Sequence, residues 1–405
     1  MAFSWKRNLY IMWIGSFFIS ASYTVSVPFL PIFLHDELGV TNNLELWSGA
    51  VFSISFLASA LMGPFWGTIA DKYGRKSMMV RSGLSFTILY FLTYFVQDPY
   101  QLLAVRLLNG LFAGYIPAAI ALVATNTPEK HVGYSLGVMS TANAAGNILG
   151  PLMGGFLSHW LGNRNTFLVS SGLTLVSLII AIVWVKETNF NRSSARSKVW
   201  GNIKDAAANR DLSTILLLTL ITSMSVMILE PLLTIYVLQL GSNISNAAMS
   251  SGIIFSAVGV ATIIAAPRWG IIGSRIGYGK VLFIGLIGGG LGNLLQIAFH
   301  NLVLFGGLRF VYGLFFAAVY PALNSLIVKT TDPSFRGRAF SLNQSMMQAG
   351  MMLGPLLGGF LSSQLNIPAV FVINGTALLV IAMVIRRLKL GSKAEKAPEE
   401  AKALN

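Results

Sequence analysis

Long apolar runs separated by short polar connections follow one another along the whole chain. Twelve of these runs are long enough to cross a bilayer, for which an α-helix needs about 20 mostly apolar residues. The expected spans cover residues 8–34, 47–69, 78–96, 101–124, 134–159, 165–185, 213–238, 248–272, 280–298, 303–327, 338–364 and 368–387. The pattern predicts an all-α membrane protein with twelve transmembrane helices.

Composition supports this reading and excludes a soluble fold. Only 10% of the 405 residues are charged and 54% are hydrophobic, whereas a soluble domain has roughly 25% charged residues. So few charges cannot cover the surface of a water-soluble globule. The absence of cysteine also excludes disulfides and thiolate metal sites.

The net charge of +14 is distributed in a way that predicts topology and argues against nucleic-acid binding. Lys and Arg occur in every second connection, and Arg164 is the exception. This is the positive-inside pattern, which places both termini in the cytoplasm of a bacterial-type inner membrane. Lys6 and Arg7 precede an apolar run that continues to Leu34, so we expect an uncleaved first span and no signal peptide.

The chain also repeats itself, with six spans in each copy. At an offset of 203 residues, Pro28 falls on Pro231 and Arg106 falls on Arg309. At an offset of 204, residues 146–158 overlay 350–362 with 10 identities in 13 positions. We therefore expect two pseudo-symmetric six-helix bundles related by an axis along the membrane normal. The predicted bundles are residues 1–185 and 213–390, with a polar linker at 186–212 and a cytoplasmic tail at 391–405.

A glycine-rich basic motif follows the second span. Small residues permit close helix contact, and an acid beside several bases can form an ion-pair latch that differs between conformations. The alternative is a basic loop that only obeys the topology rule. The motif resembles the signature between helices two and three of the major facilitator superfamily, and its latch residues are Gly67, Asp71, Gly74, Arg75 and Lys76.

A second motif stands in the fifth span and again in the eleventh. Small residues four apart make a face for tight packing, and an internal proline removes one helix hydrogen bond. Ordinary membrane packing explains part of this pattern. The full motif resembles the antiporter motif of the drug:proton antiporter families, which implies export. Its residues are Gly146, Gly150, Pro151, Gly154 and Gly155, repeated as Gly350, Gly354, Pro355, Gly358 and Gly359.

Two ionisable residues lie within spans, where charge is costly and is usually functional. Arg106 matches the buried arginine of the superfamily, which implies a part in proton coupling; the alternative is that it bonds carbonyls and ties helices together. Glu230 is the one acid among 14 that falls inside a predicted span. A carboxyl group in apolar surroundings can exchange a proton near neutral pH. We therefore expect Glu230 to take up the driving proton or to anchor a cationic drug, unless it is a protonated packing residue.

The resemblance further implies a central cavity between the bundles. In the superfamily the first, fourth, seventh and tenth helices line that cavity. Met and aromatic side chains suit varied ligands because they adapt in shape. The side chains expected there, with amides from neighbouring helices, are Tyr23, Tyr115, Asn143, Met224, Met227, Tyr236, Tyr320 and Asn343.

These observations predict a proton-coupled antiporter that exports lipophilic, cationic or diverse drugs by alternating access. The alternatives are an exporter of one solute, such as a sugar or metabolite, and a membrane sensor. An enzyme is not expected: the G-x-S-x-G match around Ser135 opens a membrane helix, the histidines lack metal-ligand spacing, and no P-loop occurs. The expected partners are small lipophilic molecules, protons and the lipid bilayer, with no nucleic acid, metal or cofactor. We expect a monomer.

Overall fold

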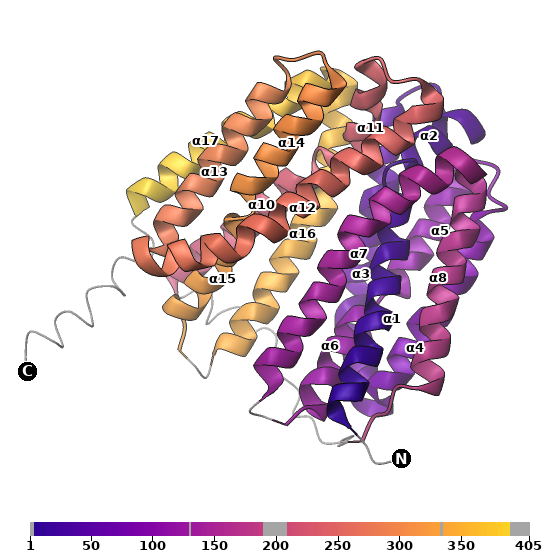
Figure 1. The fold of residues 1–405 in the computed structure, drawn as a ribbon, viewed down its shortest axis with the longest axis vertical. Helices are drawn as coiled ribbons and strands as arrows, with labels where there is room; N and C mark the ends of the chain where they lie inside the picture. The colour runs from indigo at the N-terminus through magenta and orange to yellow at the C-terminus, as the bar shows by residue number, and fades with distance from the viewer. Residues whose placement is uncertain (1–3, 129–130, 189–208, 333–334, 389–405) are drawn as a thin grey trace, which may run out of the picture. The chain divides into compact units, whose positions relative to one another are not determined.

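A computed structural model describes residues 4–128, 131–188, 209–332 and 335–388, and within these ranges every regular element is a helix. The first half contains α1 (Trp5–Val25), α2 (Leu30–Ile32), η1 (Phe33–Glu37), α3 (Leu44–Tyr73), α4 (Arg75–Thr93), α5 (Pro99–Leu111), α6 (Tyr115–Asn126), α7 (Val132–Leu161) and α8 (Asn163–Val183). The second half contains α10 (Arg210–Met227), α11 (Glu230–Gln239), α12 (Ile244–Ile276), α13 (Tyr278–Gln296), α14 (Leu302–Phe316), α15 (Val319–Thr330), α16 (Arg336–Gln364) and α17 (Ile367–Leu388). The predicted all-α membrane fold is confirmed (Figure 1).

The helices lie at the predicted spans, but not all are equally apolar. Among the described residues, eight helices or helix pairs are long and apolar enough to cross a membrane, and α1 with residues 30–37 adds a ninth, bent by 42°. The remaining spans are α4, which carries three basic residues, and α7 and α16, which are rich in Gly, Ser and Asn. Such polar and small residues lower hydropathy where helices pack on protein and not on lipid.

Four spans are each broken into two helices, namely the first, fourth, seventh and tenth. The breaks separate α1 from α2, α5 from α6, α10 from α11, and α14 from α15. A proline stands among the first three residues of each second helix, as Pro31, Pro117, Pro231 and Pro321. Proline is tolerated there because the first N–H groups of a helix have no partner within it. The prolines therefore mark where each span starts again.

The chain forms two compact units, each with its own buried core. The first comprises residues 1–195 and 231–256, and the second comprises 196–230 and 257–405. Leu9, Met79 and Leu122 are among the core residues of the first unit, and Leu282 and Leu323 are among those of the second. Residues 189–208 of the predicted linker and the predicted tail lie outside the described residues. The predicted domain boundaries stay a prediction.

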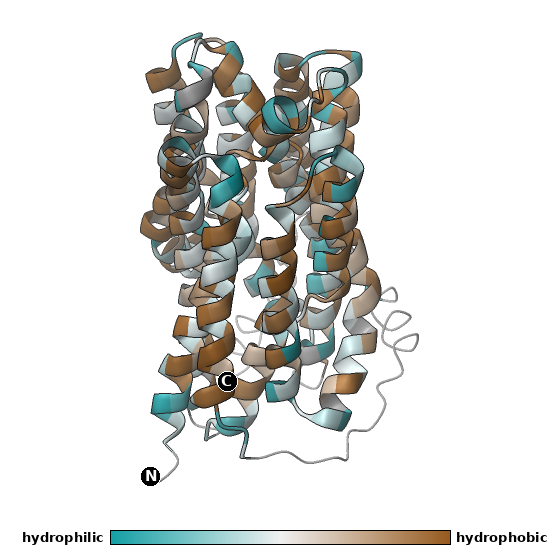
Figure 2. Ribbon diagram, turned by 90° about the vertical axis from the view of Figure 1, so that its right-hand side faces the viewer, coloured by the Kyte–Doolittle hydropathy of each residue, from teal (hydrophilic) through white to brown (hydrophobic). Residues whose placement is uncertain are grey.

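Equivalent helices pack together within each unit. In the first, α1 lies against α7 and α4 against α8; in the second, α10 lies against α16 and α13 against α17. Large apolar side chains such as Leu61, Val303 and Phe360 remain exposed, and apolar residues cover much of the helix length in Figure 2. A surface of this kind is suited to lipid and not to water.

Candidate functional site

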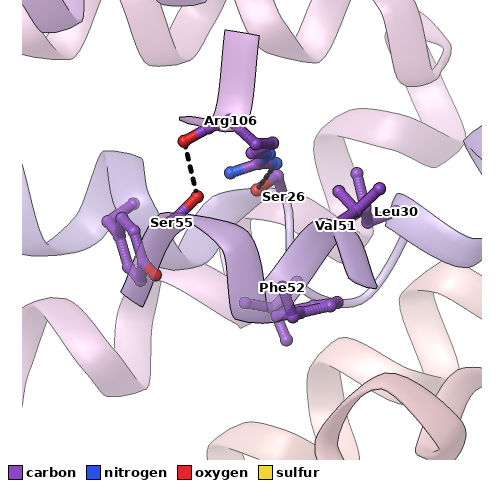
Figure 3. A pocket seen from close by; sticks show the side chains of 8 residues that line it. Ser26, Leu30, Val51, Phe52, Ser55 and Arg106 are labelled. Carbon is purple, nitrogen blue, oxygen red and sulfur yellow. Dashed lines mark hydrogen bonds between the residues drawn. The ribbon is translucent and has the colours of Figure 1, made fainter. Parts of the chain in front are cut away.

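Arg106 lies in α5 of the first unit and lines a small pocket beside the break between α1 and α2 (Figure 3). Its side chain is 7% exposed. One guanidinium nitrogen donates a hydrogen bond to Ser26 Oγ at 2.8 Å, and the Arg106 carbonyl accepts one from Ser55 Oγ at 2.9 Å. The remaining wall consists of Tyr23, Val27, Leu30, Val51 and Phe52. The pocket thus holds one cation among largely apolar side chains.

Glu230 is the first residue of α11, at the break in the seventh span, and its side chain is partly buried. It interacts electrostatically with Arg309 of α14, which is 6% exposed. The guanidinium of Arg309 also lies 5.1 Å from the ring centre of Tyr312. Arg309 is therefore the opposite charge that acts on the predicted acid inside its own unit, although the two side chains do not come within ion-pair distance of each other.

Hydroxyl and carbonyl groups of α10 make hydrogen bonds to other helices of the second unit. Ser223 Oγ lies 3.2 Å from Tyr320 Oη. At the broken end of α10, Ser225 Oγ donates to Asn374 Oδ1 at 2.7 Å, while Asn374 Nδ2 donates to the Ser225 carbonyl at 2.9 Å. These bonds satisfy polar groups that the break would leave unpaired within the membrane.

The amides predicted to line a cavity take part in hydrogen bonds near the α1–α7 and α10–α16 contacts. Asn143 Oδ1 accepts a bond from Ser20 Oγ at 2.8 Å, and Asn343 Oδ1 accepts one from Thr219 Oγ1 at 2.6 Å. Both amide side chains are partly buried, as are those of Tyr23, Met224, Met227 and Tyr320.

Two of the predicted cavity residues are buried in the structure. Tyr115 is 1% exposed, belongs to the apolar core of the first unit, and its hydroxyl lies 3.5 Å from the Ser177 carbonyl oxygen. Tyr236 is 3% exposed in α11. The place of both residues in a cavity stays a prediction.

The signature motif forms the turn from α3 to α4. Gly74 adopts φ +92°, a left-handed conformation that favours glycine. Arg75 Nη1 donates to Thr125 Oγ1 at 3.0 Å, and Lys76 Nζ donates to the Ile182 carbonyl at 2.9 Å, both within the first unit. Gly67 is exposed on α3.

The acid that contacts this motif among the described side chains is Glu187. Its two carboxylate oxygens accept the backbone N–H groups of Arg75 and Lys76 at 2.9 and 3.0 Å. A carboxylate at a helix N-terminus satisfies free N–H groups and complements the helix dipole. Asp71 lies in the last turn of α3, and its side chain is outside the described part. The latch role of the motif stays a prediction, and sequence reasoning missed Glu187.

Two side chains, Trp66 and Arg81, stabilise the break between α5 and α6, a role that was not predicted from the sequence. Arg81 Nη2 donates to the carbonyls of Phe112 and Ala113 at 3.2 and 3.0 Å, and Trp66 Nε1 donates to the Leu111 carbonyl at 2.6 Å. The Arg81 guanidinium lies 3.4 Å from the centre of the Trp66 ring. We call Trp66 and Arg81 the break clamp. The visible signal for its tryptophan is a repeat at the offset of 203 residues, where Pro64-x-Trp66-Gly67 falls on Pro267-x-Trp269-Gly270.

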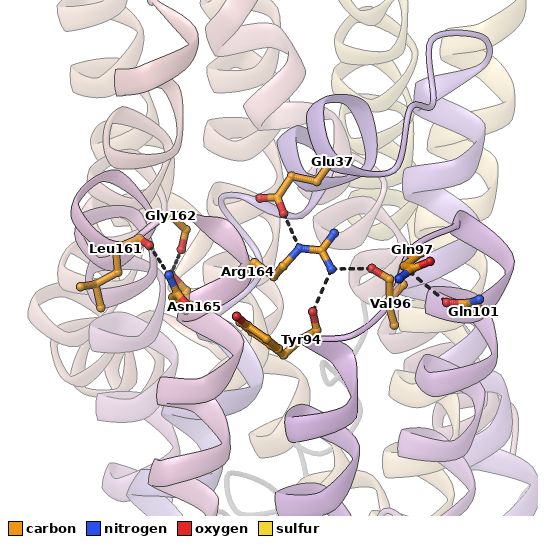
Figure 4. Close-up of polar contacts among 10 residues, drawn as sticks. Glu37, Tyr94, Val96, Gln97, Gln101, Leu161, Gly162, Arg164 and Asn165 are labelled. Atoms are coloured by element: carbon orange, nitrogen blue, oxygen red, sulfur yellow. Dashed lines mark hydrogen bonds and ion pairs between the residues drawn. The ribbon is translucent and has the colours of Figure 1, made fainter.

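Arg164, the exception to the charge pattern, is held by contacts beyond the C-terminal end of α4 (Figure 4), whereas the signature motif lies at the start of that helix. Its Nε donates to Glu37 Oε2 at 2.9 Å, and its Nη1 donates to the carbonyls of Tyr94 and Val96 at 2.8 and 2.7 Å. The cation thus joins η1, α8 and the end of α4. A structural partner explains why a basic residue occurs in this connection.

The two glycine-proline motifs are helix contacts. A Cβ on Gly146, Gly150 or Gly154 of α7 would collide with atoms of α1, and for Gly154 the colliding atom is the Val25 carbonyl oxygen. A Cβ on Gly350 or Gly354 of α16 would collide with α10 in the same way, and a Cβ on Gly358 would collide with Ile228, the residue that follows α10. Gly155 faces the backbone of Ala248 and Met249 in α12, within the first unit. Gly359 is buried, and Pro151 and Pro355 lie inside their helices.

Comparison with known proteins matches this chain to membrane transporters. The sequence profile of the Major Facilitator Superfamily matches residues 12–260 and again residues 215–404. Multidrug resistance protein MdtG of Proteus mirabilis is 39% identical over 375 residues, which cover 91% of this chain and 92% of that protein. The protein of the same name from Escherichia fergusonii is 37% identical over 385 residues, or 93% of each chain.

Solved structures show the same fold at low sequence identity. The bacterial homologue of the human lysosomal transporter Spinster superposes with a TM-score of 0.78 at 16% identity, covering 96% of this chain and 97% of that one. The nucleoside transporter NupG superposes with a TM-score of 0.75 at 15% identity, covering 95% and 99%. At such identities the likeness concerns the fold alone.

Proposed function

The chain belongs to the Major Facilitator Superfamily, and from this premise we propose that it exports lipophilic drugs in exchange for protons by alternating access. The observation that carries the proposal is Glu230, a partly buried carboxyl group at a helix break opposite Arg309. The printed names of its relatives, multidrug resistance proteins, support the choice of cargo. No cofactor is needed, because the proton gradient supplies the energy.

The proposed mechanism begins with the charge balance between Glu230 and Arg309. While Glu230 is ionised, the opposite charges attract and offset the cost of placing each in the membrane. When Glu230 binds a proton, that attraction ends and Arg309 is left without it. A bound proton shifts the balance between two conformations only if it binds one of them more tightly. Drug and proton must therefore favour different states.

The helix breaks in the first, fourth, seventh and tenth spans are the expected location of substrate binding. Each break frees backbone groups from the regular helix ladder, and the side chains around it, such as Ser225 and Asn374, exchange bonds with them. Repeat-based transporters place binding sites at such discontinuous helices near the bilayer midplane. Within the second unit, we place the drug beside these breaks, against Met224, Met227 and Tyr320.

Transport into inside-out membrane vesicles tests this proposal directly. Vesicles containing the wild-type chain, with an imposed pH gradient, should accumulate several lipophilic dyes and drugs, and collapsing the gradient should stop the accumulation. Glu230→Gln should lose the response, whereas Glu45→Gln, which changes an acid in a predicted outer connection, should keep it. Accumulation that ignores the gradient would refute antiport. Movement of a single sugar and of no drug would favour a solute exporter.

We also propose an inner-membrane location with both termini in the cytoplasm and a monomeric state. An epitope tag inserted between residues 195 and 200 should be inaccessible to antibody in intact cells and accessible after permeabilisation. Labelling of intact cells would overturn this orientation.

A further inference from the structure

The two halves carry an arginine at the same repeat position, but only one of these cations has an acid at the matching neighbour. Arg106 and Arg309 are 203 residues apart and are 7% and 6% exposed. At the same offset, Glu230 of the second half corresponds to Val27 of the first. Val27 lines the Arg106 pocket. The repeat position that holds the acid Glu230 near Arg309 in the second half therefore holds the apolar Val27 near Arg106 in the first half.

Among the described acids of the first unit, none forms an ion pair with Arg106. Asp36 lies against His35, Asp98 caps α5, and Glu45 stands in the first turn of α3. Glu37 is paired with Arg164, and Glu187 caps α4. Asp71 follows Ser55, the α3 residue that touches Arg106, by 16 residues, which is about 24 Å along a helix. Tyr90 interacts electrostatically with Arg106, but it is a phenol and not a carboxylate.

The donors of Arg106 are also underused. A guanidinium has five N–H donors arranged to hold two oxygens of one planar anion. Ser26 Oγ accepts the one side-chain hydrogen bond that Arg106 makes to the described residues. A buried cation without an opposite charge is costly within a membrane, and a ligand that brings a negative charge removes that cost.

We propose that the Arg106 pocket binds the anionic group, a carboxylate or sulfonate, of an otherwise apolar compound. The anion pairs with the guanidinium, and the apolar body lies against Tyr23 and Phe52, the partly buried side chains of the pocket wall. This inference rests on the proposed drug export and names a substrate class for it: lipophilic anions. The second half has its own internal acid at this place, so we expect no equivalent site around Arg309.

Fluorescence titration of the purified full-length protein, in uncharged detergent without added lipid, tests the pocket. The probes are dansylglycine, which carries a carboxylate, and dansylamide, which has the same ring system without it. Arg106→Gln should weaken dansylglycine binding by about 10- to 100-fold, as expected for a lost charge-assisted bond, and should leave dansylamide unchanged. Because dansylamide binding reports a folded protein, selective loss cannot come from unfolding.

Position 27 supplies the matched pair of variants. Val27→Glu brings the acid of the second half to Arg106 and should cause the same selective loss of dansylglycine. Val27→Gln has a similar size without the charge and should weaken dansylglycine binding less than Val27→Glu does, so the difference between the two variants reports the charge alone. Equal effects of Val27→Glu and Val27→Gln, or an Arg106→Gln protein that binds dansylglycine like wild type, would refute the site.

The two proposals fail separately in these assays. If the protein binds the anion selectively but exports nothing in vesicles, the proposal of drug export is refuted and the proposal of the anion pocket is supported. Gradient-driven export of dyes by a protein that binds dansylglycine and dansylamide equally well would overturn the pocket alone. Failure of the wild-type protein to bind dansylglycine would overturn it as well.

Discussion

The fourth and tenth spans carry the same buried arginine and surround it with different chemistry. Arg309 in the tenth span interacts with Glu230, whereas Arg106 in the fourth has Ser26 and the apolar Val27. The repeated fold places the two cations in equivalent positions, and one neighbouring side chain decides whether the protein or a ligand must balance the charge. Pseudo-symmetry of the backbone therefore need not give two copies of one site.

The breaks that follow these arginines differ too. Trp66 and Trp269 are repeat equivalents, and each donates its indole N–H to a carbonyl near the end of α5 or α14, at 2.6 and 2.8 Å. In the first half Arg81 adds two hydrogen bonds to the broken end. The equivalent position in the second half is Ile284, which has no donor. We infer that the first break is the more firmly held of the two.

Replacing the acid of the second half should have the largest effect on function. Glu230→Gln should reduce gradient-driven export by about 5- to 150-fold, the usual range for loss of coupling between two binding events. Val27→Gln, at the equivalent place, should reduce that export less. Initial rates of dye uptake by inside-out vesicles, with and without a pH gradient, measure both. Persistent stimulation by the gradient in Glu230→Gln would remove Glu230 from the mechanism.

Replacing each arginine in turn should change the free energy of unfolding by different amounts, because the two arginines have different surroundings. Arg309→Gln leaves Glu230 buried without its opposite charge and should lower the free energy of unfolding by about 3 kcal/mol. Arg106→Gln leaves no acid behind, so the change should stay within about 1 kcal/mol, because the lost bond to Ser26 and the relieved cost of the cation offset each other. Reversible unfolding in mixed micelles compares them. Equal losses would mean that Arg106 has an acidic partner.

The break clamp should have the next largest effect. Arg81→Met keeps the apolar stem and loses the donors to Phe112 and Ala113, which should cost about 2 kcal/mol. Ile284→Met, a change of similar volume at the equivalent site, should cost less than about 1.5 kcal/mol. The same unfolding assay applies. A larger loss for Ile284→Met would show that the second break depends more on packing than the first does on hydrogen bonds.

The smallest difference is expected between the paired tryptophans. Trp66→Phe and Trp269→Phe each lose one indole hydrogen bond, worth about 1 kcal/mol. Trp66→Phe also weakens the stacking with Arg81, which adds about 0.5–1 kcal/mol. Melting temperatures measured side by side should therefore fall further for Trp66→Phe. Indistinguishable values would mean that the stacking contributes nothing measurable.

Apolar run length and the repeat were enough to predict the spans, the all-α fold and the superfamily. The breaks were missed, although Pro117 and Pro321 were visible signals, because a proline inside an apolar run does not say whether the helix bends or stops. The runs around them were therefore read as continuous helices.

The sites were predicted less completely, because their chemistry depends on contacts between distant segments. Glu230 could be singled out by counting acids, but its interaction with Arg309 depends on how α11 meets α14. The role of Arg81 depends on which carbonyls the break leaves unpaired, and hydropathy carries no such information. Tyr115 was chosen by helix membership, which does not say which face of a helix points toward the core, and the structure places it in the core of the first unit.

The glycine contact between α7 and α1 has a consequence for how this protein can change over generations. Any side chain at Gly154 meets the Val25 carbonyl oxygen, so a single substitution there carries its cost at once and no neighbouring side chain can move aside to relieve it. The wall of the Arg106 pocket, formed by side chains such as Leu30 and Phe52, is not restricted in this way. Selection for new cargo can therefore act on that wall while the helix frame is inherited unchanged.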